Sequence, residues 1–375
     1  MIYLDSAATT VQKPSEVAMA MARTVSTAAS PGRGGHRWGR EAARIVFECR
    51  EAVAKLFGVP DPEQVVLTFN ATHGLNIAIR SLVKPGMTVL ISGYEHNAVT
   101  RVLHGIPDIT IRVAAAPLFE TEALLDQFRS ELSRGVDCVI CNHVSNVFGF
   151  VLPIEEIGVL CRRFDTPFIV DASQSAGCVT INFTAIGAQF VAMPGHKGLY
   201  GPQGTGLLIC GQTGEPLLCG GTGSLSRLQE MPEDLPDRLE AGTPNVPGAA
   251  GLLAGIRFVS AQGVENIGRY ERSLIQRLGK LLAKVEGVRL YRSEDPKRQT
   301  GVLSFCLDGI DCERVGEWLG DRGIAVRAGL HCAPLAHESA GTLGTGTVRA
   351  SVSCFNTASE MEQAVALISR LSVMG

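Results

Sequence analysis

Short apolar runs and amphipathic, helix-like segments alternate between about residues 40 and 210. Helical periodicity covers Arg40–Phe57 and Leu75–Leu82. The apolar runs are Val65–Phe69, Thr88–Ser92, Val136–Asn142, Pro167–Val170, Phe190–Met193 and Gly206–Cys210. This pattern is typical of a mainly parallel sheet with helices on both faces. Ligands bind such sheets at the carboxyl ends of the strands, so the polar residues directly after each run are the first candidates for a site.

The second half of the chain begins with a glycine- and proline-rich stretch of little periodicity, Gly211–Gly251. Irregular stretches of this length usually serve function or an interface. Two helices are predicted after it, over Leu252–Gly263 and Ile267–Val285. The last third alternates strand and helix over Val288–Tyr291, Gly301–Leu307, Cys312–Gly320, Val348–Val352 and Ser359–Val373. We therefore predict an α/β protein with a smaller C-terminal α/β domain, divided near residue 255.

Composition excludes several classes of protein. The 375 residues include 34 Lys and Arg against 37 Asp and Glu, a net charge of -3, which removes the usual electrostatic reason to expect nucleic-acid binding. Apolar residues make up 45% of the chain, as in a globular protein. No apolar run approaches the roughly 18 residues of a membrane span, and the first residues lack the pattern of a secretory signal. We expect a cytoplasmic protein without membrane contact.

The 11 cysteines fit a reducing compartment because they are odd in number and scattered in apolar segments. Cys138 and Cys141 form the one C-x-x-C pair. They fall in a run that predicts a buried strand, where residues three apart face opposite sides. A metal or redox pair is therefore not expected there.

Four strand ends carry groups that suit chemistry, and each has a structural alternative. The segment Asn70–Gly74 opens a helix, where it forms an anion site or an ordinary N-cap. His96 is a functional or a surface histidine. Asp171 is a buried carboxylate that needs a cation, or a helix cap. Lys197, set among glycines, is a desolvated nucleophilic amine or a solvated turn lysine.

Taken together, these groups match the needs of a pyridoxal phosphate enzyme. Such an enzyme needs a lysine for the imine, an acid for the pyridine nitrogen, a flat group over the ring, donors to the phenolic oxygen and an anion cradle. This chain offers a candidate for each at the strand ends of one sheet.

The chain also resembles the class V aminotransferase superfamily and, within it, the cysteine desulfurases. The matching segments are Tyr3–Thr10, Glu95–His96, Ser145–Gly149, Val170–Gln174, Gly195–Lys197, Glu240–Asn245 and Arg349–Ser351, which span nearly the whole chain in the family's order. The resemblance implies the type I fold of pyridoxal phosphate-dependent transferases. It implies a large cofactor-binding domain over 16–254 and a small domain formed by 1–15 and 255–375.

The resemblance further implies a role for individual residues. Lys197 would form the imine, Asp171 would bind the pyridinium nitrogen, and His96 would stack on the ring. The remaining assignments are Asn146 and Gln174 near the phenolic oxygen, Ala71, Thr72 and His196 at the phosphate, Thr243 at the phosphate of the other subunit, and Arg349 with Asn146 at the substrate carboxylate. The role of Thr243 implies a homodimer. Pro194 stands where the family usually has serine or threonine, and Ala71 where it often has threonine, so we expect a thinner phosphate cradle.

The segment Arg327–Pro334 points to the reaction. Moving an amino group needs no thiol, whereas removing sulfur from cysteine does, and Cys332 offers one. Its thiolate would attack the substrate sulfur and become a persulfide while alanine is released, and His331 or Arg327 could favour the thiolate electrostatically. The short loop resembles group II desulfurases, in which turnover would depend on an acceptor that can reach in.

Other hypotheses about the function remain open. The substrate could be L-selenocysteine instead of L-cysteine, or the chain could be another class V aminotransferase or lyase in which Cys332 is incidental. A scaffold without chemistry has no need for intact Lys197, Asp171 and Arg349. The sulfur acceptor is not named by any segment. His36 and Arg37 flank the substrate entrance or form a surface turn, and His337 is a weak candidate for the same entrance.

Overall fold

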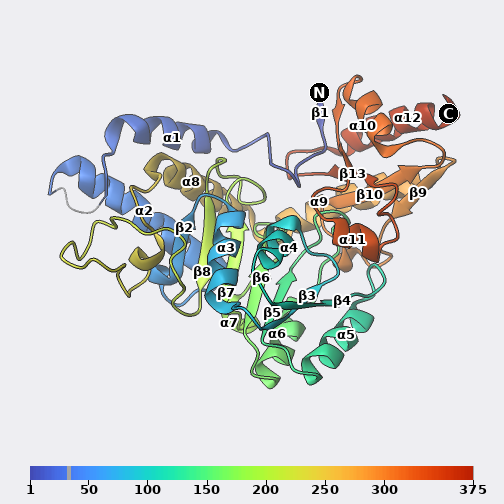
Figure 1. Cartoon of the computed structure of the whole chain (residues 1–375). Coiled ribbons are helices and arrows are strands. Elements are labelled where there is room, and N and C mark those ends of the chain that lie inside the picture. Colours follow the sequence, from blue (N-terminus) through green and yellow to red (C-terminus); the bar gives the residue numbers. More distant parts are fainter. Residues whose placement is uncertain (32–34, 375) are drawn as a thin grey trace.

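The computed structural model describes residues 1–31 and 35–374. Its largest element is a seven-stranded sheet with the order β2-β8-β7-β6-β5-β3-β4 (Figure 1). The strands are β2 (Val65–Thr68), β3 (Thr88–Ser92), β4 (Thr110–Ala114), β5 (Cys138–Asn142), β6 (Phe168–Asp171), β7 (Phe190–Pro194) and β8 (Gly206–Cys210). All six predicted apolar runs form strands of this sheet, and β4 is a seventh strand that was not predicted.

The sheet is mainly parallel, as predicted, except at one side. Strands β7, β6, β5, β3 and β4 run parallel to one another, whereas β8 is antiparallel to both β7 and β2. The connection from β7 to β8, residues 195–205, contains no helix. A parallel crossover needs a dozen or more residues and usually a helix, so this short link returns the chain antiparallel.

Helices cover both faces of the large sheet. They are α1 (Ser15–Thr27), α2 (Arg37–Phe57), α3 (Ala71–Leu82), α4 (Asn97–His104), α5 (Thr121–Ser133), α6 (Ile154–Arg163), α7 (Phe183–Ile186) and α8 (Val246–Gln262). One core cluster includes side chains of α2, α5, α6 and α8, and a second, on the opposite face, includes those of α3 and α4. Cys141 belongs to the first core and Cys138 to the second, so the C-x-x-C pair points to opposite faces as predicted.

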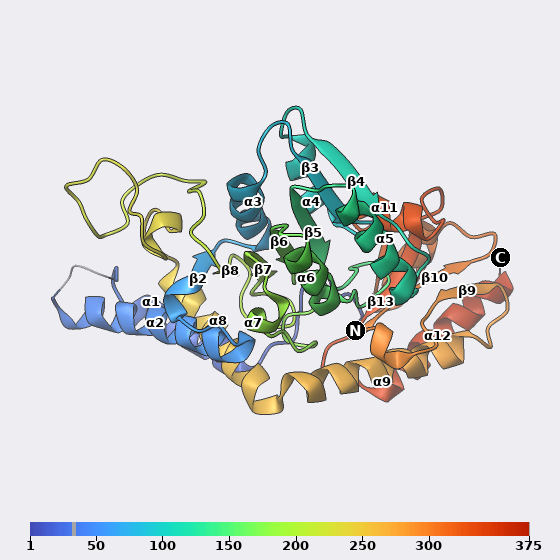
Figure 2. The ribbon, with the colours of Figure 1, turned by 90° about the horizontal axis from the view of Figure 1, so that it is seen from below.

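The C-terminal third forms a second, smaller sheet with the order β12-β13-β10-β9. Its strands are antiparallel: β9 (Val288–Tyr291), β10 (Val302–Leu307), β12 (Arg327–Gly329) and β13 (Thr347–Ser351). The helices of this part are α9 (Val264–Leu282), α10 (Cys312–Gly320), α11 (Pro334–Ser339) and α12 (Ala358–Met374). Helix α9 runs along the lower edge of the view in Figure 2, from the end of α8 to α12.

The N-terminus is built into the small sheet. Strand β1 (Ile2–Tyr3) pairs in parallel with β11 (Ile324–Ala325), and Leu4 packs in the same core as the small sheet. The predicted division at residue 255 falls inside α8. In α8, Ile256 packs in the core of the large sheet, whereas Leu274 of α9 packs in that of the small sheet.

Helix α8 begins earlier than predicted, at Val246, inside the stretch expected to be irregular. It is apolar on most sides, so it lacks the amphipathic period that marks a surface helix. The stretch before it contains only a short 3₁₀ helix over Asp237–Leu239. None of the described helices is long and apolar enough to cross a bilayer.

Candidate active site

A cavity opens at the carboxyl ends of β3, β5, β6 and β7, where the sheet was predicted to bind its ligand. It brings together eight of the predicted site residues: Ala71, Thr72, His96, Asn146, Asp171, Gln174, His196 and Lys197. Pro194 and Asn142 also line it. The remaining predicted residues, Cys332, Arg349 and Thr243, lie outside its lining.

Lys197 and Asp171 supply the two opposite charges of this cavity. Asp171 ends β6 and is 4% exposed, and its Oδ1 accepts a 2.9 Å hydrogen bond from the Ser173 N–H. Lys197 follows β7 in the Gly195–Gly198 turn. Burial lowers the pKa of Lys197 to about 8, and the nearby Asp171 carboxylate limits that fall. A neutral amine is therefore accessible near neutral pH, which suits a nucleophilic lysine.

Two neutral histidines stand at the same cavity. His96 is the N-cap of α4, where its Nδ1 accepts a 3.0 Å hydrogen bond from the Ala98 N–H. That bond fixes its ring, and burial lowers its pKa. His196 Nδ1 lies 3.0 Å from Thr9 Oγ1, and burial together with the Lys197 and Lys13 charges lowers its pKa to about 4.

Helix α3 presents its N-terminus to the cavity. Asn70 caps this helix by accepting the His73 N–H at 2.9 Å through Oδ1. The first N–H groups of a helix have no intrahelical partner, and here they belong to Ala71 and Thr72. Backbone donors at a helix start favour an anion.

The amide side chains of Asn146 and Gln174 are partly engaged. Gln174 Nε2 donates to the Ala7 carbonyl at 2.9 Å, and Asn146 Nδ2 donates to the His331 carbonyl at 2.8 Å. Asn146 Oδ1 is buried and has no hydrogen-bond partner among the described residues. A buried unpaired amide oxygen is costly, and a ligand in the cavity that offers a donor would satisfy it. The lysine–aspartate pair and the helix start fit pyridoxal phosphate, whereas its phenolic oxygen and phosphate are acceptors and could take a hydrogen bond only from Asn146 Nδ2, not from Oδ1.

Arg349 lies beside this cavity and already holds a carboxylate. The side chain is 2% exposed, donates to the Asn146 carbonyl at 2.9 Å and contacts Asp5 Oδ1 at 2.7 Å. Arg327 reaches the other Asp5 oxygen at 3.4 Å. Asp5 was not among the predicted site residues. The available signal was an aspartate directly after a short apolar strand, the same signal that marked Asp171.

Cys332 lies in a loop of four residues, 330–333, between β12 and α11. The cysteine is exposed, and both His331 and Cys332 adopt left-handed backbone angles, with φ of 54° and 56°. Asn146 holds the His331 carbonyl, and the Asn97 N–H holds that of Cys332 at 2.8 Å. Such strained conformations persist only where the surroundings fix them, and they cluster at functional sites.

His331 does not supply the positive charge that was expected beside Cys332. The residue is 7% exposed, and burial, reinforced by the Arg349 charge, lowers its pKa to about 2. The ring is therefore neutral at physiological pH, and this part of the expectation is wrong. Arg327 is the remaining cation that the sequence placed near the thiol.

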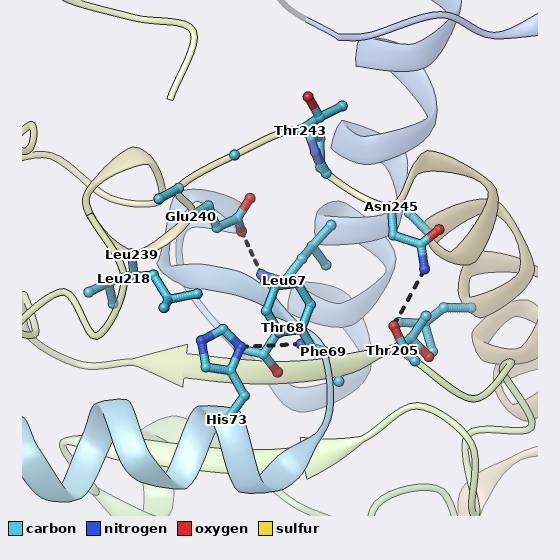
Figure 3. Close-up of a pocket in the computed structure, with 17 residues that line it drawn as sticks. Leu67, Thr68, Phe69, His73, Thr205, Leu218, Leu239, Glu240, Thr243 and Asn245 are labelled. Carbon is cyan, nitrogen blue, oxygen red and sulfur yellow. Dashed lines mark hydrogen bonds between the residues drawn. The ribbon is translucent and has the colours of Figure 1, made fainter. Parts of the chain in front are cut away.

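Thr243 stands apart from Lys197 in the same chain. It is exposed and lines a second cavity, together with Phe69, His73 and Glu240 (Figure 3). The Glu240 carboxylate anchors this loop because it accepts the Leu67 N–H at 2.5 Å and pairs with the buried Arg50 at 2.7 Å. Thr243 therefore faces outward from a fixed loop.

The three weaker candidates from the sequence are explained by their positions in the fold. His36 is exposed and caps α2, accepting the Gly39 N–H at 3.1 Å, and Arg37 is the exposed first residue of that helix. His337 is fully buried and bonds Thr342 Oγ1 at 2.7 Å, so it does not line an entrance.

Comparison with known proteins places the chain in a family. Residues 2–364 match the Aminotransferase class-V family, so the chain belongs to it. Within that family it groups with the cysteine desulfurases. It is 32% identical to a probable cysteine desulfurase of Methanothermobacter thermautotrophicus, over 100% of this chain and 95% of the relative.

Solved structures agree with this grouping. The cysteine desulfurase of Thermococcus onnurineus has a TM-score of 0.91 and 32% identity, covering 100% of this chain and 95% of its own. The Escherichia coli cysteine desulfurase CsdA has a TM-score of 0.85 and 27% identity, covering 99% and 94%. The predicted type I fold and family are confirmed.

Proposed function

We propose that this chain is a pyridoxal phosphate-dependent cysteine desulfurase that converts L-cysteine to L-alanine and carries the sulfur on Cys332. One observation carries the proposal: Asn146, at the cavity of Lys197 and Asp171, is hydrogen-bonded to the backbone of the loop that presents the exposed thiol. An aminotransferase needs no such thiol at its lysine. The family of the chain and its cysteine desulfurase relatives support the same assignment.

The residues of the cavity would contact different parts of the cofactor. When bound, pyridoxal phosphate supplies the electron sink that allows the α-proton of an amino acid to leave. Asp171 would hold the charge on the pyridinium nitrogen, His96 would lie against the ring, and Lys197 would provide the amine that attaches the cofactor. Ala71, Thr72 and His196 would hold the phosphate, and Asn146 and Gln174 would reach the phenolic oxygen.

Lys197 also moves the proton of the substrate. A pKa of about 8 lets its amine accept a proton from the α-carbon and return one at neutral pH. Arg349 and Asn146 bind the α-carboxylate, which turns the sulfur of the substrate toward Cys332.

Cys332 receives the sulfur. Its thiolate attacks the substrate sulfur, an S–S bond forms as the carbon–sulfur bond breaks, and protonation of the carbon gives the methyl group of alanine. Atoms balance as cysteine plus enzyme thiol giving alanine plus enzyme persulfide. Because the thiol is exposed on a short fixed loop, a thiol acceptor, protein or small molecule, must approach it to take the sulfur.

We further propose that the enzyme is a cytoplasmic homodimer in which Thr243 of each subunit reaches the phosphate of the other. The outward position of Thr243 on an anchored loop supports this arrangement.

To test this, the purified holoprotein is incubated with L-cysteine and a reductant, and alanine and sulfide are measured in the same sample. Equal amounts of both support the proposal, and Cys332→Ala should then abolish both. Sulfide with pyruvate would identify a lyase and overturn the role of Cys332. Activity on L-selenocysteine alone would make the chain a selenocysteine lyase.

A further inference from the structure

Glu95 lies buried between the ends of β3 and β5, directly before the ring-stacking candidate His96. Its side chain is fully buried, as is that of Ser92, and Asn142 is 3% exposed. Glu95 Oε1 lies 2.6 Å from Ser92 Oγ, and Ser92 Oγ lies 2.8 Å from Asn142 Oδ1. Three side-chain oxygens therefore form a short chain behind the cofactor cavity, whose lining includes Asn142.

The Asn142 amide can be oriented in only one way. Its Nδ2 donates to the Tyr94 carbonyl oxygen at 2.8 Å. Turning the amide over would place Oδ1 against that carbonyl, and two acceptors would then face each other. Oδ1 therefore faces Ser92 Oγ and can only accept.

Counting protons along this chain leaves one acceptor without a donor. The Ser92 hydroxyl has a single proton but stands between two oxygens, Glu95 Oε1 and Asn142 Oδ1. An amide oxygen carries no proton, so the second proton must sit on the carboxyl group. Glu95 then donates to Ser92, and Ser92 donates to Asn142. Ser92 also accepts the Tyr94 N–H at 3.1 Å, so both its lone pairs and its proton are used.

An ionised Glu95 would be poorly accommodated. Its Oε2 is buried with no hydrogen-bond partner among the described residues, and the Asp171 carboxylate on β6 already carries the negative charge at this end of the sheet. Cys141 on β5 also faces the group and stays a thiol, because burial raises its pKa well above the usual value. Burial, with a smaller contribution from Asp171, raises the pKa of Glu95 to about 8.

We infer that Glu95 is a protonated carboxylic acid at neutral pH and the donor of a hydrogen-bond chain through Ser92 to Asn142 that positions His96 and Asn142 beside the cofactor. Oε1 also accepts the Asn142 N–H at 2.8 Å, and a protonated carboxyl oxygen can both accept there and donate to Ser92, whereas a carboxylate oxygen can only accept. Because Glu95 is then uncharged, Asp171 would be the carboxylate that faces the pyridinium nitrogen. Glu95 is a positioning residue, and the part that concerns the cofactor rests on the proposed function.

Infrared spectroscopy tests the protonation without any turnover. A protonated carboxyl has a carbonyl band that is separate from the carboxylate bands. Subtracting the Glu95→Gln spectrum from the wild-type spectrum at pH 7 should leave one such band, which should titrate away with a midpoint near pH 8. Glu271→Gln serves as the assignment control, because burial also raises the pKa of Glu271 to about 8 and its band must persist in Glu95→Gln. A difference spectrum that shows only carboxylate bands at pH 7 would overturn the inference.

Affinity for pyridoxal phosphate tests the positioning role. Glutamine cannot both accept from Asn142 and donate to Ser92, so Glu95→Gln loses one buried hydrogen bond and should bind the cofactor about three- to tenfold more weakly. Ser92→Ala, which removes the middle of the chain, should weaken it similarly. Unchanged cofactor affinity in both variants would overturn the positioning role, whatever the protein does with cysteine. Wild-type protein that shows the band and binds the cofactor but forms no alanine from L-cysteine would instead contradict the proposed function.

Discussion

The side-chain amide of Asn146 donates a 2.8 Å hydrogen bond to the backbone carbonyl of His331, although the two residues are 185 positions apart. Asn146 lines the cavity of Lys197, and His331 precedes the exposed Cys332. This bond therefore connects the proposed cofactor site in the large sheet with the proposed sulfur carrier at the edge of the small one. It also explains how His331 and Cys332 keep two consecutive left-handed backbone angles.

Removing this bond should loosen the cysteine loop. A single net hydrogen bond contributes about 0.5–1.5 kcal/mol, so Asn146→Ala should speed amide hydrogen exchange over 330–333 by roughly three- to tenfold. Exchange followed by mass spectrometry measures this. Asn266→Ala, at an exposed position on α9, should leave the same amides unchanged. Equal protection in both variants would show that Asn146 does not hold the loop.

Cys332 should be the one cysteine whose loss abolishes desulfuration. Its exposed thiol makes no hydrogen bond among residues 1–31 and 35–374, so Cys332→Ala should keep its fold and cofactor content. Alanine formation from cysteine should drop to background. Cys219→Ala is the matched control, because Cys219 is the other exposed cysteine of the described chain. A persulfide on Cys219, or full activity in Cys332→Ala, would contradict the assignment.

The ion pair between Asp5 and Arg349 should be important for stability. Arg349 is 2% exposed, and removing Asp5 leaves its buried guanidinium without a carboxylate, at a cost of roughly 3–5 kcal/mol. We expect Asp5→Ala to show this loss in urea unfolding followed by tryptophan fluorescence. The double variant Asp5→Ala/Arg349→Met should lose less than the sum of the single variants.

A pair on the same domain provides the control for that experiment. Asp308 and Arg289 are both more than half exposed, so Asp308→Ala should change the free energy of unfolding by less than about 1 kcal/mol. If Asp5→Ala unfolds like Asp308→Ala, solvent or another group must compensate the Arg349 charge.

The sequence predicted the strands of the large sheet well because fully buried strands appear as uninterrupted apolar runs. Thr88–Ser92 and Gly206–Cys210 have the predicted bounds. The antiparallel direction of β8 was not predicted, because an apolar run does not show whether its strand runs parallel or antiparallel to the neighbouring strands. Helix α8 was placed six residues late, since an almost uniformly apolar helix has little period to detect.

The residues that line the cavity could be predicted from the sequence, but the buried contacts that hold them in place could not. Polar residues at the ends of parallel strands must meet, so Asp171, Lys197 and His96 could be brought together from their positions alone. Asp5 meets Arg349 across 344 positions, and no local pattern shows such a contact. His331 was expected to carry a positive charge beside the thiol. Burial keeps it neutral instead, and a loop sequence does not show whether a residue is buried.

Covalent attachment of the cofactor should depend on pH through Lys197. Its pKa of about 8 means that the reactive neutral amine increases as the pH rises, about fivefold from pH 7 to 8, and levels off above pH 9. Borohydride trapping of pyridoxal phosphate on the apoprotein measures this rate. Lys13 is the matched control, since burial also lowers its pKa to about 8. Lys13→Met should keep the profile and Lys197→Met should abolish it, and the reverse result would make Lys13 the reactive amine.

Thr243 should act in the site of the other subunit. If each phosphate accepts a hydrogen bond from the partner's threonine, Thr243→Ala should weaken cofactor binding by roughly ten- to a hundredfold, as expected for a bond to a charged group. Lys197→Ala should be inactive in its own site. A mixed dimer of the two variants then contains one site with both Lys197 and Thr243 intact.

Mixing these two variants separates action between subunits from action within one. Refolded together, Thr243→Ala and Lys197→Ala chains should regain cofactor binding at wild-type affinity in one of the two sites of each mixed dimer, along with desulfuration. Mixing Thr243→Ala with Asp171→Ala should restore activity equally, because Asp171 belongs to the same site as Lys197. Mixing Lys197→Ala with Asp171→Ala should restore nothing, which controls for subunit exchange. If the mixtures with Thr243→Ala contain no site of wild-type cofactor affinity while mixed dimers are seen by native mass spectrometry, Thr243 serves its own chain or none.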